Sequence, residues 1–288
     1  MLGSVLAIAI ALVWGFSTVL IRKNLTESNY FSVSLIITIV GLMVFAPLVF
    51  LFISLNSVNV YGLLFFFLAG IFHPGFVRLL YFKGMEKVGA SVNAAIYASN
   101  PIFSSLIAVI LLNEKLELIG WIGILCVVLG AILIENINSD HPQPSIRKGL
   151  VYSFSAALLV GFSYVARKEG LILWDSPIIG ATISYIAALL VYSCAFPFLS
   201  NNVNNRTLNR LAFKLFWKAG VGISIGQLLS FYALKYSDVS TVVPLIQIEP
   251  LFIFLFIRYY LKGIEIISHK LVLGTLIIIL GVFLVMLS

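Results

Sequence analysis

The chain has 288 residues, of which 61% are hydrophobic and only 10% are charged, and its mean hydropathy is +1.11. A soluble domain would carry about a quarter charged residues, so too few polar side chains remain here to cover a water-facing surface. The composition therefore excludes a soluble globular protein and predicts an all-α integral membrane protein. The net charge of +7 comes from basic residues scattered over short loops, which indicates contact with anionic lipid headgroups and not with nucleic acid.

Apolar segments follow one another along the chain, each close to the roughly 20 residues that a helix needs to cross a bilayer core. They are continuously apolar and do not alternate, so we predict helices and not barrel strands. In this division Glu249 is the acidic residue that lies mid-span and Arg78 is the basic residue clearly inside a span, while the other charges lie in loops or near span ends. Arg167 and Lys168 fall in the loop after the sixth span. The ten predicted transmembrane helices are 3–21, 31–54, 60–82, 91–112, 119–135, 150–166, 177–199, 216–234, 240–261 and 269–287.

The two halves of the chain share short patterns in the same order. Gly15-Phe16-Ser17 corresponds to Gly161-Phe162-Ser163, and further on Asn100-Pro101 corresponds to Glu249-Pro250. Each half holds an odd number of spans, so the second half must enter the membrane from the opposite side, an arrangement found in transporters. We therefore expect two inverted five-helix repeats, residues 1–138 and 150–288, joined by a linker over 139–149.

The sequence resembles EamA-type members of the drug/metabolite transporter superfamily over nearly its whole length. The resemblance is carried by Trp14-Gly15-Phe16-Ser17 in the first span and by Pro101 followed by Glu114. It implies a secondary carrier of small polar metabolites, often an amino-acid exporter, and we expect it in the cytoplasmic (inner) membrane. Val160 stands where the first half has Trp14, and this is a departure from the repeated pattern.

The basic residues and the resemblance disagree about orientation. Lys and Arg gather in the loops after odd-numbered spans, and the positive-inside rule then places both termini outside the cell. The resemblance instead implies that both termini lie in the cytoplasm. The orientation is left open by the sequence.

Two charged residues are candidates for a site at mid-membrane. Glu249 lies mid-span, where a carboxylate costs roughly 2.5–3.5 kcal/mol on insertion scales, so it should face a polar interior. It would bind a substrate ammonium or a proton, or else form a structural ion pair. Arg78 either belongs to the same site or extends to the headgroups. His73-Pro74-Gly75 precedes it and predicts a bend that opens the helical backbone.

The fourth span carries polar residues at helical spacing, namely Asn93, Tyr97, Asn100 and Ser104. A continuous helix would place them on one face, either along a cavity or hydrogen-bonded to a partner helix. In the eighth span, Gly222 and Gly226 predict close helix packing. The candidate substrate-binding residues are Glu249, Arg78, Asn100, Gln227, Asn93, Tyr97, Trp14 and Tyr81.

These features favour a carrier that works by alternating access on an amino acid or a related zwitterion. Arg78 would bind the carboxylate and Glu249 the ammonium. The expected partners are a small-molecule substrate, the lipid bilayer and, as a candidate, a coupled proton, with the chain acting as a monomer or homodimer. A carrier of a nucleotide, a sugar derivative or a cationic drug-like compound, a passive pore and an intramembrane scaffold are the alternatives. We expect no enzyme activity, cofactor or metal, because no nucleophile–base pair or metal cluster is recognisable at membrane depth.

Overall fold

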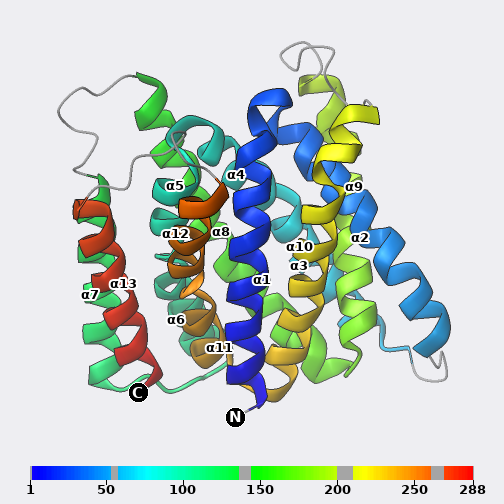
Figure 1. Ribbon diagram of the computed structural model, residues 1–288. Coiled ribbons are helices and arrows are strands. Elements are labelled where there is room, and N and C mark those ends of the chain that lie inside the picture. Colours follow the sequence, from blue (N-terminus) through cyan, green and yellow to red (C-terminus); the bar gives the residue numbers. More distant parts are fainter. Residues whose placement is uncertain (1, 53–57, 136–143, 200–209, 261–268, 288) are drawn as a thin grey trace.

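The computed structural model describes residues 2–52, 58–135, 144–199, 210–260 and 269–287, and within these ranges all regular structure is helical. The helices form a bundle, and the two chain termini lie at the same end of it (Figure 1). The elements are α1 (Leu2–Asn24), η1 (Leu25–Glu27), α2 (Tyr30–Phe52), α3 (Val60–Gly70), η3 (Ile71–Phe76), α4 (Val77–Val88), α5 (Ala90–Tyr97), α6 (Asn100–Leu111), α7 (Leu118–Glu135), α8 (Pro144–Leu173), α9 (Pro177–Leu199), α10 (Arg210–Tyr236), α11 (Val239–Ile246), α12 (Glu249–Tyr260) and α13 (His269–Met286).

Several of these helices have the length and composition of membrane spans. Among the described residues there are five such segments, Leu2–Asn24, Tyr30–Leu51, Val60–Val88, Arg147–Leu173 and Pro177–Pro197, and Asn100–Leu111 and Val272–Leu284 are shorter apolar helices. Large apolar side chains cover the outside of the bundle; Phe50 is 89% exposed and Leu118 is 76% exposed. An apolar exterior of this extent suits lipid and not water.

The predicted fourth and ninth spans are each broken into two helices. Helix α5 ends at Tyr97 and α6 begins at Asn100, while α11 ends at Ile246 and α12 begins at Glu249. In both places a proline follows the first residue of the new helix. Proline is accepted in a first helical turn because the N–H that it lacks has no partner there. The helix is therefore completely interrupted in both spans, and α6 and α12 each begin with the polar residue of the repeated Asn-Pro or Glu-Pro pair.

The sixth predicted span is longer than the sequence suggested. Helix α8 begins at Pro144 and continues through Arg167 and Lys168 to Leu173, so the prediction that these two basic residues lie in a loop is wrong. Arg167 is fully buried and Lys168 is partly buried, and neither charge ends the helix. The helix also includes the last part of the predicted linker 139–149, whose residues 139–143 lie outside the described ranges.

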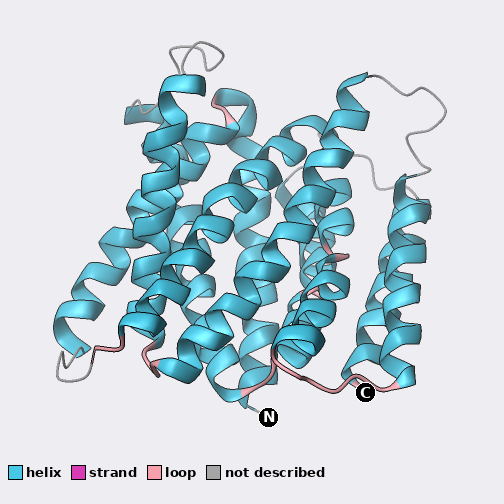
Figure 2. Ribbon diagram, turned by 180° about the vertical axis from the view of Figure 1, so that it is seen from behind, coloured by secondary structure: helices cyan, strands magenta, loops and turns pink. Residues whose placement is uncertain are grey.

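Helices from the two halves of the chain pack against each other throughout the bundle (Figures 1 and 2). Helix α1 contacts α10 and α12, whereas α8 contacts α3, α4 and α6. Helices α7 and α13 contact each other extensively and stand together at one edge of the bundle. The prediction that Gly222 and Gly226 allow close packing is confirmed, since a Cβ atom on them would overlap Ser17 and Trp14 of α1, respectively.

The bend predicted at His73-Pro74-Gly75 is also confirmed. His73 has an extended backbone, with φ −139° and ψ 119°, between helices α3 and α4. The carbonyl groups released by this break are hydrogen-bonded by the second half of the chain. Ser163 Oγ of α8 donates to the Ala69 carbonyl at 2.9 Å and to the His73 carbonyl at 3.3 Å, and the Tyr192 hydroxyl of α9 donates to the Pro74 carbonyl. These bonds remove the cost of unpaired backbone groups at membrane depth.

Candidate functional site

A partly open pocket lies where α1, η3, α4, α5, α10 and α12 meet. Three of the contributing elements, η3, α5 and α12, adjoin the helix breaks described above. Breaks at membrane depth are tolerated where they line a cavity, and here they bring polar side chains to the pocket. Its lining residues are Trp14, Thr18, His73, Val77, Arg78, Tyr81, Phe82, Tyr97, Ile223 and Glu249.

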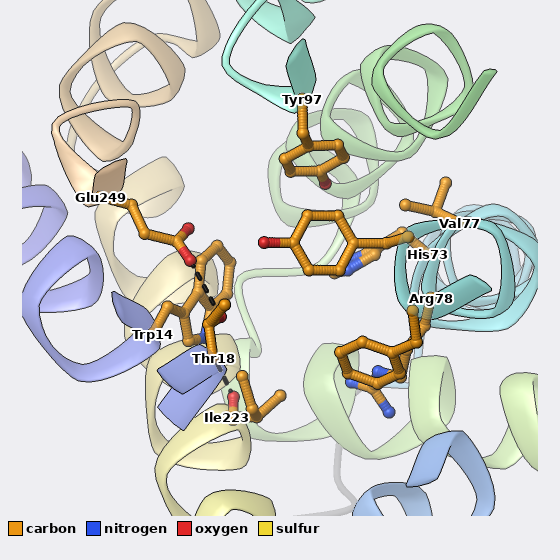
Figure 3. Close-up of a pocket in the computed structure, with 10 residues that line it drawn as sticks. Trp14, Thr18, His73, Val77, Arg78, Tyr97, Ile223 and Glu249 are labelled. Carbon is orange, nitrogen blue, oxygen red and sulfur yellow. Dashed lines mark hydrogen bonds between the residues drawn. The ribbon is translucent and has the colours of Figure 1, made fainter. Parts of the chain in front are cut away.

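Glu249 provides the acidic side of the pocket. Only 8% of this residue is exposed, and its Oε1 accepts a hydrogen bond of 3.1 Å from Thr18 Oγ1. Trp14 lies on the same side, where its Nε1 donates to the Ile223 carbonyl at 3.2 Å (Figure 3). One carboxylate oxygen therefore has a neutral donor, while the carboxylate as a whole faces the pocket (Figure 3).

Arg78 lies across the pocket from Glu249 (Figure 3). It is 3% exposed; Nη1 donates to Thr38 Oγ1 at 2.8 Å and Nη2 donates to the Tyr185 hydroxyl at 2.9 Å. The guanidinium carbon also stands 4.9 Å from the centre of the Tyr185 ring, a cation–π contact. These inward contacts show that Arg78 does not extend to the headgroups.

Arg167 of α8 is a buried cation that the sequence interpretation missed. It is fully buried; Nη1 donates to Ser230 Oγ at 3.2 Å, and Nη2 contacts His73 Nδ1 at 2.5 Å and the His73 carbonyl at 3.0 Å. Its guanidinium carbon lies 5.1 Å and 5.2 Å from the ring centres of Tyr164 and Phe231. The apolar residues 171–174, beyond Glu169 and Gly170, were the available signal, because they continue the helix past these charges.

The predicted site residues divide into two groups. Glu249, Arg78, Trp14, Tyr81 and Tyr97 all line the pocket. Thr18 lines it too, although it was not predicted; its spacing of four residues from Trp14, which puts both on one helical face, was the available signal.

The remaining three predicted residues are buried away from the pocket lining. Asn93 Oδ1 accepts a hydrogen bond of 2.6 Å from Ser153, and Asn100 Nδ2 donates to the Tyr97 carbonyl at 3.0 Å. Neither amide atom of Gln227 has a hydrogen-bond partner in the described part of the chain. A continuous helix would have placed the polar residues of the fourth span on one face. The break after Tyr97 interrupts that face, so these residues contact different neighbours.

The three buried charges at and beside the pocket have no oppositely charged partner among the described residues. The ion pairs within those ranges are Lys168–Asp238, at 3.5 Å, and Lys235–Asp175, at 2.8 Å, and both have an exposed acid. Glu249, Arg78 and Arg167 are instead hydrogen-bonded to neutral groups. An unpaired acid and an unpaired base on opposite sides of one small pocket can bind the two charges of a small solute.

Comparison with known proteins is consistent with this geometry. The sequence profile of the EamA-like transporter family matches residues 1–135 and 147–287. An uncharacterized transporter of Archaeoglobus fulgidus is 23% identical over 287 residues, which cover 100% of this chain and 99% of that protein. A solved crystal structure has a similar fold, with a TM-score of 0.70 over 99% of this chain and 97% of that one, at 15% identity.

Proposed function

The chain belongs to the EamA-like transporter family, and from this premise we propose that it is a secondary carrier of an amino acid or a related zwitterion. It would work in the cytoplasmic membrane by alternating access, with the pocket between Glu249 and Arg78 as the substrate site. The observation that carries this proposal is the pair of opposite, unpaired charges facing one pocket. A carboxylate would be bound by the guanidinium, and an ammonium by the Glu249 carboxylate.

The proposed ten-span architecture of two inverted five-helix repeats is supported by contacts that recur between the halves. Gly15 of α1 packs against the backbone at Glu249 and Ile253 of α12, and Gly161 of α8 packs against the backbone at Phe103 and Ser104 of α6. These contacts occupy matching positions, because Gly15 matches Gly161 and the start of α12 matches the start of α6. Reciprocal packing of this kind is what a two-fold relation between halves produces, and it supports a pocket at the repeat interface.

The substrate class is tested by ligand-dependent thermal stabilisation of the purified protein. The probes are free L-amino acids, their methyl esters, which lack the carboxylate, and their N-acetyl derivatives, which lack the ammonium. A zwitterion site should respond to at least one free amino acid and lose most of that response with either derivative. A response of equal size to the ester or the acetylated form would contradict the zwitterion proposal.

The role of Glu249 is tested with Glu249→Gln, which keeps an acceptor for Thr18 and removes the charge. We expect at least a tenfold loss of affinity for the best amino acid, since a lost charge-assisted hydrogen bond costs about 1.5–3 kcal/mol. In proteoliposomes the same variant should lose counterflow and any response to an imposed pH gradient. Glu117→Gln is the matched control, because Glu117 is exposed. Unchanged counterflow in Glu249→Gln would remove Glu249 from the site.

A further inference from the structure

We propose that Arg167 fixes His73 as a neutral imidazole with its proton on Nε2, and that this N–H is a second donor for the anionic end of the substrate. The first part concerns the protein alone. The second part rests on the proposed function, because it names the carboxylate that Arg78 would bind as the acceptor. Arg167 would thus be a positioning residue and His73 a binding residue.

The protonation state of His73 follows from the chemistry of its partner. Arg167 Nη2 lies 2.5 Å from His73 Nδ1, and a guanidinium can donate hydrogen bonds but cannot accept them. His73 Nδ1 must therefore present its lone pair, and in a neutral ring the proton is then on Nε2. An imidazolium, or the Nδ1–H tautomer, would direct one N–H at another.

The guanidinium that imposes this state is itself held in place. Besides the imidazole, Arg167 donates to Ser230 and to the His73 carbonyl, so it contacts both the side chain and the backbone of the residue at the helix break. The rings of Tyr164 and Phe231 flank it. A fully buried cation without an acidic partner among the described residues is expensive, which argues that it has a task beyond packing.

The other ring nitrogen of His73 remains for the pocket. His73 lines the same pocket as Arg78, and its ring stands edge-on to Trp14 with 6.5 Å between centroids. In the described part of the chain the hydrogen bonds of the His73 side chain involve Nδ1 alone. Arg78 and His73 lie on the side of the pocket opposite Glu249 (Figure 3). This side therefore offers a cationic donor and a neutral donor to one anionic group.

The positioning role is tested by nitrogen NMR of the full chain with ¹⁵N-labelled histidine. His141→Gln and His269→Gln are introduced together, so that His73 gives the remaining histidine signals. The expected spectrum has an unprotonated Nδ1 and a protonated Nε2. A protonated Nδ1, with or without a protonated Nε2, would overturn the proposal. This spectrum is recorded with native His73 and Arg167, so its result does not depend on whether the variants described next can fold.

Two substitutions in α8 then separate Arg167 from its neighbour. Arg167→Met should release the tautomer, so that both nitrogens give averaged or doubled signals, whereas Arg167→Lys should preserve part of the Nε2–H population. Lys168→Met is the control, because Lys168 contacts the Leu234 and Ser237 carbonyls and not His73. An unchanged tautomer in Arg167→Met, or an equal change in Lys168→Met, would overturn the role of Arg167.

The binding role is tested by His73→Gln and His73→Asn, whose amides place an N–H near the positions of Nε2 and Nδ1, respectively. His73→Gln should retain most of the affinity for the amino acid that stabilises the native protein best, and His73→Asn should lose about tenfold. The matching methyl ester should show no such difference. Equal losses in the two variants would overturn the binding role. If no amino acid stabilises the native protein, the proposed function fails, and the NMR result still decides the positioning role.

Discussion

The three buried charges among the described residues are each surrounded by neutral hydrogen-bonding groups. Glu249 has Thr18, Arg78 has Thr38 and Tyr185, and Arg167 has Ser230 and His73. A permanent internal ion pair would compensate such charges more fully, but it would leave no charge for a ligand. Neutral partners fix the position of a charged group and keep its charge available, as the proposed substrate site would require.

Glu114 illustrates a charged residue with a structural task. Its two carboxylate oxygens accept hydrogen bonds of 3.1 Å from the backbone N–H groups of Val239 and Ser240 at the start of α11. The first N–H groups of a helix have no partner within it, and a carboxylate also interacts favourably with the helix dipole. Glu114 therefore attaches the segment that follows α6 in the first half to α11 in the second.

Replacing Glu114 by Ala should lower the thermal unfolding temperature of the purified protein. The expected loss is about 1 kcal/mol, as for the removal of a helix cap, and Glu114→Gln should lose less because it keeps one acceptor oxygen. Glu117→Ala, at an exposed position of the same loop, should change stability by no more than about 0.5 kcal/mol. Equal unfolding temperatures for Glu114→Ala and Glu117→Ala would show that the cap does not stabilise the protein.

At the scale of the elements, the breaks in the helices position the pocket. The break at His73 turns the imidazole to the pocket, the break after Tyr97 lets its ring face inward, and the break before Glu249 puts the carboxylate at the start of α12. Continuous helices would bury these groups against their neighbours or turn them to lipid. Interrupted backbone is costly at membrane depth, and here serine, tyrosine and arginine side chains supply the missing hydrogen bonds.

Close packing of α1 on α10 holds the acidic side of the pocket. A Cβ atom on Gly226 would overlap the indole of Trp14, so Gly226→Ala must displace that ring from the Ile223 carbonyl. Overpacking of this kind costs about 1–3 kcal/mol. We expect a lower unfolding temperature and a weaker response to the best amino acid.

The control for Gly226→Ala is Ile225→Ala in the same helix, where the side chain is 43% exposed. It removes apolar surface from the outside of the bundle and leaves the contact between α1 and α10 intact. If the two variants lost the same stability and the same ligand response, the close approach at Gly226 would not be what positions Trp14.

At the scale of the whole molecule, the two ends of the bundle differ in charge. The termini lie at one end (Figures 1 and 2), while Arg22, Lys23 and Lys87 lie with the α1–α2 and α4–α5 connections at the other. The sequence analysis placed Arg167 in a loop at the end of the bundle that carries the termini. Because Arg167 is fully buried, it no longer counts among the loop charges at that end. The positive-inside rule thus favours termini outside the cytoplasm somewhat more strongly than before.

Cysteine labelling will decide this orientation. Cys126 and Cys194 are free and can be replaced by alanine, after which Glu27→Cys and Leu287→Cys each give one exposed thiol, at opposite ends of the bundle. A membrane-impermeant maleimide on intact cells should label one variant and not the other. Labelling of Leu287→Cys would support the charge count, and labelling of Glu27→Cys would support the resemblance to the family. Equal labelling of both would contradict the arrangement of the ends.

The sequence by itself determined the properties that depend on local composition. Long apolar segments predict membrane helices because lipid accepts no unpaired backbone, proline after a polar residue marks where helices break, and glycines mark close packing. The tertiary structure decided which way each polar residue faces. Arg167 is interior because α10 and the break at His73 provide its partners, and Asn93, Asn100 and Gln227 are turned from the pocket lining. These outcomes depend on contacts between helices far apart in the chain, which the spacing of residues along one helix does not specify.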